Sequence, residues 1–277
     1  MGDEPELSVV VPAFNEEENV GPMFERLRTA LEDVVDGFEV LFVDDGSGDG
    51  TWDEIARLAE ADPRVRGIRF SRNFGHQAAV TAGVDAARGR AVVIIDADLQ
   101  DPPEVIPEMV ARWREGWEVV YAQREQREGE TAFKKATAAG FYRLLHAITS
   151  VDIPVDTGDF RLMGPRAVAA FRALPERNRF IRGLVAWAGF PQTPVRYRRH
   201  ARHAGETKYP LRKMIRFALD GITSFSFLPL RLATWTGFAV SALSFCYIVV
   251  VVVLKVLGIN WPGYTSIMAS LLFLGGV

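Results

Sequence analysis

The sequence contains little cysteine and no large excess of charge of either sign. Cys246 is the single cysteine among 277 residues, so no disulfide can form within the chain and an oxidising compartment is not implied. The 32 Lys and Arg nearly balance the 35 Asp and Glu, and the net charge of −3 argues against a general nucleic-acid binder. Apolar residues make up 48% and charged residues 24%, which indicates a folded protein and excludes disordered and fibrous classes.

Two familiar phosphate-binding loops are also missing. The segment after the first predicted strand, residues 12–17, has no Gly-x-Gly-x-x-Gly pattern, which a dinucleotide-binding fold needs where the pyrophosphate approaches the backbone. Residues 46–50 are rich in glycine, but they follow the second predicted strand and have the wrong spacing. The P-loop lysine pattern does not occur either. Hydride transfer and P-loop chemistry are therefore disfavoured.

One long stretch near the C-terminus lacks charge altogether. Residues 232–254 contain no charged side chain, and as a helix they would extend about 35 Å, more than the roughly 30 Å hydrocarbon core of a bilayer. We expect a transmembrane helix here, a buried core helix being the alternative. A second apolar segment, residues 265–277, is too short to span, and we expect it to begin a second helix of a hairpin that the sequence cuts short.

The segment before this apolar stretch is strongly basic. Residues 193–231 carry nine Lys and Arg, opposed by Glu206 and Asp220, and such flanks stay on the cytoplasmic side of a membrane. We therefore expect a cytosolic domain at residues 1–208, held at the cytoplasmic (inner) membrane by a transmembrane hairpin at residues 231–277. Residues 209–230 mix basic and aromatic side chains, which is typical of amphipathic helices on anionic headgroups, with an ordinary surface helix as the alternative.

Apolar runs and helical periodicity alternate through the first half of the chain. Repeated strand–helix–strand units predict an α/β fold, a mostly parallel sheet with helices on both faces. Ligands of such sheets bind at the carboxyl ends of the strands, so the side chains that follow each strand are the candidates for function. The expected strands are residues 7–11, 38–43, 65–70, 91–95 and 119–122, and the expected helices are residues 17–33, 51–61, 77–87 and 103–114.

Carboxylates follow two of these strands. Asp44 and Asp45 could accept hydrogen bonds from a nucleoside or could simply form a turn, and the residues alone leave both interpretations open. Asp96 and Asp98 are two residues apart, a spacing that puts both side chains on one face of an extended chain. Such hard oxygen ligands suit Mg²⁺ or Mn²⁺ on substrate phosphates, and Gln100 could add a carbonyl oxygen. Solvated loop acids are the alternative.

Several motifs together resemble those of one enzyme family. They are residues 11–17 (Val-Pro-Ala-Phe-Asn-Glu-Glu), 43–47 (Val-Asp-Asp-Gly-Ser), 72–77 (Arg-Asn-Phe-Gly-His-Gln), 96–104 (Asp-Ala-Asp-Leu-Gln-Asp-Pro-Pro-Glu), 156–161 (Asp-Thr-Gly-Asp-Phe-Arg) and 205–210 (Gly-Glu-Thr-Lys-Tyr-Pro). This set resembles the family 2 glycosyltransferases, which have the GT-A fold. Within them it is similar to the polyisoprenyl-phosphate glycosyltransferases, namely the bactoprenol glucosyltransferases and, more distantly, the dolichyl-phosphate mannose synthases. The resemblance covers nearly the whole chain.

The resemblance implies a role for each part of the site. The metal, Mg²⁺ or Mn²⁺, would be held by Asp96, Asp98 and Gln100. Asp159 would be the catalytic carboxylate near the anomeric carbon, with Arg161 beside it. The nucleotide sugar would be bound by Pro12, Asn15, Glu16, Asp44, Asp45, Ser47, Arg72, His76, Asp96 and Asp98. Cations near the membrane would bind the acceptor phosphate, and our candidates are Arg124, Arg127, Lys134, Arg202 and Lys208.

The expected reaction is one inverting transfer of a sugar from a nucleotide sugar to a membrane polyprenyl phosphate. Processive members of the family carry a Gln-x-x-Arg-Trp motif that this sequence lacks, which favours a single transfer. UDP-glucose is the favoured donor, with GDP-mannose or a UDP-amino sugar as alternatives. The competing functions are a nucleotidyl- or phosphotransferase on the same sheet and a non-catalytic membrane scaffold. The resemblance also allows self-association through the hairpins, and no nucleic-acid partner is expected.

Overall fold

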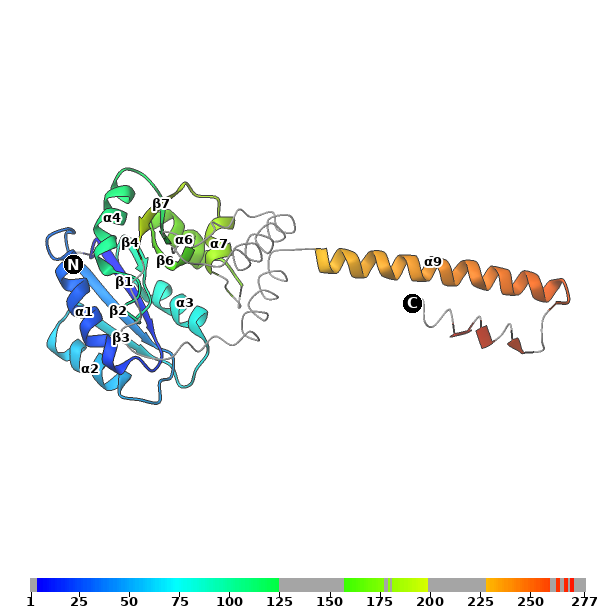
Figure 1. Cartoon of the computed structure of the whole chain (residues 1–277), viewed down its shortest axis with the longest axis horizontal. Coiled ribbons are helices and arrows are strands. Elements are labelled where there is room, and N and C mark those ends of the chain that lie inside the picture. The colour runs from blue at the N-terminus through cyan, green and yellow to red at the C-terminus, as the bar shows by residue number, and fades with distance from the viewer. Residues whose placement is uncertain are drawn as a thin grey trace. The chain divides into compact units, whose positions relative to one another are not determined.

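The structure is a computed structural model. It describes residues 4–124, 157–176, 179, 181–198, 228–259, 263–264, 267–268 and 270–271. The chain divides into two compact units, one of Met1–Ala147 with Val151–Gly221 and one of Ile148–Ser150 with Ile222–Val277. Figure 1 shows the elements of each.

A seven-stranded mixed sheet forms the centre of the first unit, in the order β3-β2-β1-β4-β6-β5-β7. Strands β1, β2, β3 and β4 are mutually parallel where they pair, and β7 is parallel to β5. Strand β6 is antiparallel to both of its neighbours, β4 and β5. The strands are β1 (Leu7–Ala13), β2 (Phe38–Asp44), β3 (Val65–Arg69), β4 (Ala91–Ile94), β5 (Val119–Arg124), β6 (Thr157–Met163) and β7 (Gln192–Tyr197).

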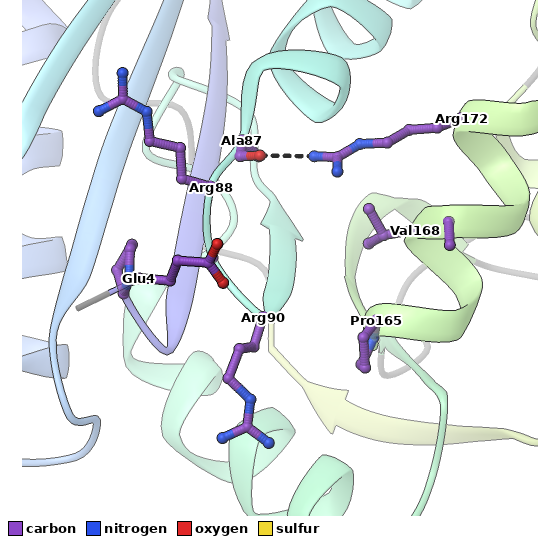
Figure 2. A pocket seen from close by; sticks show the side chains of 10 residues that line it. Glu4, Ala87, Arg88, Arg90, Pro165, Val168 and Arg172 are labelled. Atoms are coloured by element: carbon purple, nitrogen blue, oxygen red, sulfur yellow. Dashed lines mark hydrogen bonds between the residues drawn. The ribbon is translucent and has the colours of Figure 1, made fainter. Parts of the chain in front are cut away.

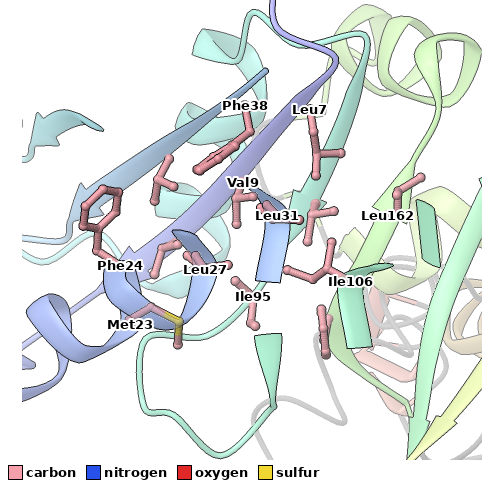
Figure 3. Close-up of a cluster of buried hydrophobic side chains, with 14 of the residues drawn as sticks. Leu7, Val9, Met23, Phe24, Leu27, Leu31, Phe38, Ile95, Ile106 and Leu162 are labelled. Carbon is pink, nitrogen blue, oxygen red and sulfur yellow. The ribbon is translucent and has the colours of Figure 1, made fainter. Parts of the chain in front are cut away.

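Helices cover both faces of this sheet, as the alternation of the sequence predicts. On one face the apolar side of α1 meets β1 and β4, and Figure 3 shows Met23, Leu27 and Ile106 packed there. On the other face α3 approaches so closely that a Cβ on Gly83 would lie 2.2 Å from Val10 Cγ1, which makes glycine necessary. The helices are α1 (Glu17–Leu31), α2 (Thr51–Ala61), α3 (His76–Ala86), the 3₁₀ turn η1 (Pro103–Val105), α4 (Ile106–Arg114), α6 (Pro165–Ala173) and α7 (Ile181–Trp187).

The reversed direction of β6 positions the site. The register pairs Ile94, the last residue of β4, with Arg161. Asp96 follows Ile94 by two residues and Asp159 precedes Arg161 by two, so both carboxylates lie beyond this pair on the same side. The start of β6 thus reaches the edge of the sheet where the parallel strands end. Asp159, near the start of β6, therefore joins the carboxylates at the ends of β2 and β4.

One geometric expectation is wrong. Strand β4 ends at Ile94, and Ala97 and Asp98 lie in a turn. The chain from Asp96 to Asp98 is therefore not extended, and the expected placement of both side chains on one face of a strand does not apply. Leu99 has a φ of 58°, in the left-handed region, which reverses the chain towards Gln100. The direction of each carboxylate is set by this turn rather than by the pleat of the strand.

The second unit contains α9 (Leu228–Val256). Residues Leu230–Val256 have a mean hydropathy of 2.5, and by length and composition they are able to cross a membrane. Side chains such as Trp235, Phe238 and Leu243 are exposed along this helix. The Tyr247 hydroxyl lies 3.0 Å from the Tyr264 hydroxyl and links α9 to the segment that follows it. The expected juxtamembrane helices at residues 209–230 lie outside the described residues except for the first turn of α9.

Candidate functional site

The loops after β1 and β2 are joined by hydrogen bonds that involve Asn15. Its backbone N–H donates to Ser47 Oγ at 2.9 Å, and its side-chain Oδ1 accepts from the Gly48 N–H at 2.9 Å. Asn15 has a φ of 56°, a conformation that Asn adopts more readily than most residues. The Glu16 N–H donates to Thr51 Oγ1, and Pro12 is buried inside β1. Asn15, Glu16 and Ser47 therefore form one rigid rim at this edge of the sheet.

The two carboxylates after β2 have different surroundings. Asp45 accepts from the backbone N–H groups of Phe74 at 2.7 Å and Gly75 at 2.9 Å, so it fixes the loop before α3. Asp44 Oδ1 accepts from the Ser47 N–H. Among the described residues its buried Oδ2 has no hydrogen-bond partner, although Arg69 Nε lies 3.7 Å from it as an ion-pair partner. A buried acceptor without a donor is costly unless a ligand supplies one. Asp44 is thus the better placed of the two to meet a nucleoside.

Gly46 brings this rim against the loop before α3. Its φ is 71°, and a Cβ there would lie 2.4 Å from the carbonyl carbon of Arg72. The exposed Arg72 guanidinium in turn stacks over the Phe74 ring at 4.1 Å. Two loops that carry candidate donor-binding residues therefore touch through their backbones at Gly46.

Replacement of Gly46 by Ala is expected to lower the free energy of unfolding by about 1–3 kcal/mol, because the new methyl group meets backbone and the left-handed φ disfavours it. Nucleotide affinity is expected to fall with it, since the rim must shift. Urea unfolding and calorimetric titration with UDP measure both effects. The matched control is Gly48→Ala in the same loop, where a Cβ meets nothing within 4 Å and φ is not left-handed. Equal behaviour of the two variants would contradict the proposed packing.

Asp96 and Asp98 form an acidic group at the end of β4. Asp96 Oδ1 is buried and has no hydrogen-bond partner among the described residues, and the nearest cation is His76, whose Nε2 lies 3.7 Å away. Burial, with the charges of Asp159, Asp101 and Asp98, raises the pKa of Asp96 to about 6, although His76 opposes the rise. Asp98 is 9% exposed and accepts from the Gln100 N–H at 3.1 Å. Negative charge therefore exceeds positive charge in this group, with His76 as the cation beside it.

Asp96 and Asp98 fit a divalent cation that takes some of its ligands from the protein and the others from a substrate. No three His, Cys, Asp or Glu side chains within the described part of the chain could hold a metal by themselves. Mg²⁺ and Mn²⁺ commonly bind through one or two carboxylates and complete their shell with substrate phosphates and water. The orphaned Asp96 oxygen and its raised pKa are the features that such a cation would remove.

Asp159 is the most heavily hydrogen-bonded carboxylate that the structure describes in this region. Its Oδ1 accepts from Arg182 Nε at 2.7 Å. Its Oδ2 lies 3.0 Å from His76 Nε2 and accepts from Gln77 Nε2 at 3.3 Å and from Arg182 Nη2 at 3.3 Å. Burial alone would raise the pKa of Asp159, but the His76 hydrogen bond and the Arg182 and His76 charges hold it well below its usual range.

The same contacts act on His76. Burial would lower the pKa of His76, but the Asp159 hydrogen bond and the charges of Asp96 and Asp159 raise it to about 9. The imidazole is therefore a cation at neutral pH. It lies between Asp159, which has further hydrogen-bond partners, and Asp96, whose Oδ1 is 3.7 Å away and has no hydrogen bond among the described residues.

Arg161 lies on the same face of β6 as Asp159 but makes different contacts. It is 4% exposed and donates to the carbonyl oxygens of Gly158 at 3.1 Å and Asp159 at 3.4 Å. Burial lowers its pKa to about 10, although Asp159 opposes the shift. In these contacts Arg161 supports the backbone at the start of β6.

Arg124 ends β5 and is held by two residues from other strands or loops. Its Nε donates to the Tyr197 hydroxyl at 3.1 Å, and its Nη2 lies 3.7 Å from Asp101 Oδ2. The Tyr197 hydroxyl donates to Asp101 Oδ1 in turn. The other candidate acceptor cations, Arg127, Lys134, Arg202 and Lys208, lie outside the described residues.

Replacement of Tyr197 by Phe removes the hydroxyl that joins Arg124 to the fully buried Asp101. We expect the free energy of unfolding to fall by about 1–3 kcal/mol, because an acceptor is left with fewer donors. We also expect the affinity for an acceptor to fall more than that for a donor nucleotide, whose candidate residues follow β1, β2 and β4 rather than β5. Chemical unfolding and separate KM values test this. An unchanged acceptor KM would remove Arg124 from the acceptor site.

Comparison with known protein families shows to which family the chain belongs. Residues 8–170 match the model of glycosyl transferase family 2. The chain belongs to glycosyltransferase family 2. It is a glycosyltransferase with the GT-A fold, and the fold expected from its sequence motifs is confirmed.

Relatives of this family 2 enzyme share most of its length. It is 50% identical to the uncharacterized glycosyltransferase YkcC of Bacillus subtilis over 98% of this chain and 84% of the relative. It is 42% identical to the bactoprenol glucosyl transferase of Shigella phage SfV over 98% of this chain and 89% of the relative. Among solved structures, a Mycobacterium tuberculosis glucosyl-3-phosphoglycerate synthase with Mn²⁺, UDP and glucosyl-3-phosphoglycerate matches with a TM-score of 0.51 at 19% identity, covering 79% of this chain and 77% of that one. This likeness shows the fold alone.

Four residues of the glycosyltransferase site were missed from the sequence: Gln77, Asp101, Arg182 and Tyr197. Gln77 and Asp101 lie inside motifs that the sequence does show, directly after His76 and Gln100, and they could have been found as polar neighbours of candidates. Arg182 and Tyr197 come from α7 and β7, which the sequence periodicity did not predict.

One pocket of the enzyme lies near the start of β4, away from the candidate site at the carboxyl ends of the strands. Figure 2 shows it between the segment before β4 and helix α6, lined among others by Arg88, Arg90 and Arg172. Arg172 Nη2 donates to the Ala87 carbonyl at 2.6 Å, and its Nε donates to the Val84 carbonyl at 3.1 Å. Its guanidinium thus caps the end of α3. The guanidinium groups of Arg88, Arg90 and Arg172 point in different directions in Figure 2 and do not converge on one point.

Proposed function

We propose that this glycosyltransferase transfers one sugar from a nucleotide sugar, with UDP-glucose favoured, to a membrane polyprenyl phosphate at the cytoplasmic face of the inner membrane. The observation that carries the proposal is the acidic group of Asp96 and Asp98 beside the His76–Asp159–Arg182 cluster at one edge of the sheet. The bactoprenol glucosyl transferase of phage SfV, 42% identical over nearly the full chain, supports the choice of acceptor and sugar.

The donor would lie across the carboxyl ends of β1, β2 and β4. Asp44 Oδ2, which has an ion-pair contact with Arg69 Nε at 3.7 Å but no hydrogen bond, would accept one from the nucleoside, and the rim of Asn15 and Ser47 would shape its pocket. Mg²⁺ or Mn²⁺ would be held by Asp96 and Asp98, with Gln100 nearby, and would neutralise the charge that develops on the leaving diphosphate. The cationic His76 borders the same place and would contribute in the same sense.

The acceptor needs little activation. A phosphate monoester has a second pKa near about 6, so it is mostly dianionic at neutral pH and can attack without a strong base. Orientation for an inverting, in-line displacement is then the main requirement. Arg124, fixed by Tyr197 and Asp101, would bind the acceptor phosphate together with the basic residues outside the described part of the chain.

Helix α9 would hold the enzyme at the membrane where this acceptor lies. Its apolar span of 27 residues exceeds the thickness of a hydrocarbon core. The basic flank that precedes it in the sequence favours a cytoplasmic catalytic domain.

Metal affinity should depend on pH in a defined direction. Because a proton competes for Asp96, whose pKa is about 6 without metal, Mn²⁺ affinity is expected to fall about tenfold per pH unit below pH 6 and to be nearly constant above pH 7. Titration of Mn²⁺ in the presence of UDP-glucose, whose diphosphate diester has no ionisation near pH 6, followed by electron paramagnetic resonance, measures this. Asp96→Asn is expected to abolish the dependence. A flat profile in the unaltered enzyme would show that Asp96 is not a ligand.

A donor panel tests the proposed reaction. The full chain in detergent is incubated with undecaprenyl phosphate, Mn²⁺ and radiolabelled UDP-glucose, GDP-mannose or UDP-amino sugars, and the label that enters the organic phase is counted. We expect UDP-glucose to label the lipid. Use of another donor alone would correct the sugar. Nucleotide release without labelled lipid would refute the acceptor, and no turnover with a folded protein would favour the non-catalytic scaffold.

A further inference from the structure

Asp159 is anchored from two helices that are far apart in sequence. His76 and Gln77 stand at the start of α3, and Arg182 is the second residue of α7. Together they direct three side chains at one carboxylate that is 5% exposed. A carboxylate held on both oxygens has a fixed orientation, and the groups around it are fixed with it.

Gln77, on α3, makes hydrogen bonds to both β6 and α7. Its Nε2 donates to Asp159 Oδ2 on β6 at 3.3 Å, while its Oε1 accepts from the backbone N–H of Ile181 at 3.0 Å. That N–H belongs to the first residue of α7, and the first N–H groups of a helix have no partner within the helix. The Gln77 oxygen therefore caps α7, and its NH₂ group fixes the Asp159 carboxylate. Arg182, the residue after Ile181, binds the same carboxylate.

Arg182 binds Asp159 as a fork. Nε reaches Oδ1 at 2.7 Å and Nη2 reaches Oδ2 at 3.3 Å, a two-pronged geometry that lysine cannot reproduce. The pair fixes the plane of the carboxylate and with it the position of Oδ2. His76 Nε2 lies 3.0 Å from that oxygen and 3.7 Å from Asp96 Oδ1. The placement of the imidazole at the diphosphate site thus depends on residues that lie behind it.

We propose that Gln77 and Arg182 are positioning residues for sugar transfer, which act through Asp159 to hold His76 and the reaction centre in place. This inference rests on the proposed function. It makes α7 part of the active site, although none of its residues was a candidate from the sequence. It also predicts that the two residues affect the rate of transfer rather than binding of the donor.

The test is a double-mutant cycle on the full chain in detergent. Arg182→Gln is expected to lower kcat about 100-fold and to change the donor KM by less than about threefold, because a fixed charge-assisted contact is lost behind the substrate. Arg182→Lys should recover part of this loss. In an Asp159→Asn background, Arg182→Gln should cost less than about threefold, since the two residues act as one unit. Arg166→Gln, an exposed arginine on α6 that stacks on Phe190, is the matched control and should retain full activity.

The Gln77→Glu variant tests the two hydrogen bonds of the Gln77 amide separately. The new carboxylate keeps an acceptor for the Ile181 N–H but loses the donor to Asp159 and faces it with like charge. We expect kcat to fall about 10- to 100-fold with the protein folded, as judged by its melting curve. Additive losses in the cycle, or a rise in donor KM with an unchanged kcat, would overturn the proposal.

Failure of the proposed function is a distinct result. If the unaltered enzyme forms no lipid-linked sugar with any donor, the acceptor assignment fails. The cycle is then measured on hydrolysis of UDP-glucose to UDP, for which the same non-additivity is expected. Additive effects on hydrolysis would overturn the positioning role irrespective of the acceptor.

Discussion

Replacement of Asp96 by Asn is expected to lower sugar transfer about 1,000-fold or more while the protein stays folded. The metal that Asp96 would hold supplies several kcal/mol of transition-state stabilisation, and each 1.36 kcal/mol is a factor of about ten in rate. The side chain keeps its shape, so packing should not suffer. Because burial and neighbouring like charges raise the pKa of Asp96 in spite of His76, the variant without metal should be at least as stable as the unaltered enzyme.

Steady-state transfer rates with saturating Mn²⁺, together with unfolding curves in EDTA, measure both parts of this prediction. Asp36→Asn is the control, since Asp36 is an exposed carboxylate in the turn before β2, away from the strand ends that carry the site. EDTA should reduce the unaltered enzyme to the level of the Asp96 variant. A variant that keeps more than a tenth of the activity would remove Asp96 from the metal site.

Asp159→Asn is the second change with a large expected effect. It removes the charge that pairs with both His76 and Arg182, and we expect the free energy of unfolding to fall by about 1–3 kcal/mol. This is less than for a fully buried pair, because the two cations are partly exposed and solvent screens them. Transfer is expected to fall about 100- to 1,000-fold, since the reaction centre loses its anchor.

Two measurements separate these effects. Urea unfolding gives the stability, and transfer rates at a temperature well below the melting point give the activity of folded protein. The pKa of His76, followed by NMR, should fall from about 9 towards its ordinary value when the Asp159 charge is gone. Near-full turnover in the Asn variant, with an intact fold, would exclude Asp159 from the reaction.

The sequence predicted the parallel half of the fold well. Strands β1 to β5 and helices α1 to α4 lie where apolar runs and helical spacing put them, with ends shifted by a few residues. Strands β6 and β7 and helices α6 and α7 were not predicted. The apolar pattern of β6 is interrupted by Asp159 and Arg161, two residues of the candidate site, so the sequence indicated this strand only weakly.

The candidate site was predicted in part for a similar reason. The motif residues at the ends of β1, β2 and β4 were found, because parallel strands end at a common edge. The approach of Asp159 to Asp96, with His76 between them, depends on the antiparallel direction of β6. The different surroundings of Asp44 and Asp45 depend on loop backbone, which no local pattern encodes. The site roles taken from the family resemblance stay predictions.

The most direct test is the mass of the lipid that the enzyme makes. The full chain in detergent is supplied with undecaprenyl phosphate, UDP-glucose and Mn²⁺, and the lipid fraction is analysed by mass spectrometry beside an Asp98→Asn reaction. The proposal predicts undecaprenyl phosphate that carries one hexose, formed by the unaltered enzyme and absent with EDTA or with the variant. A lipid fraction without glycolipid, from folded enzyme and with every donor of the panel, would contradict it.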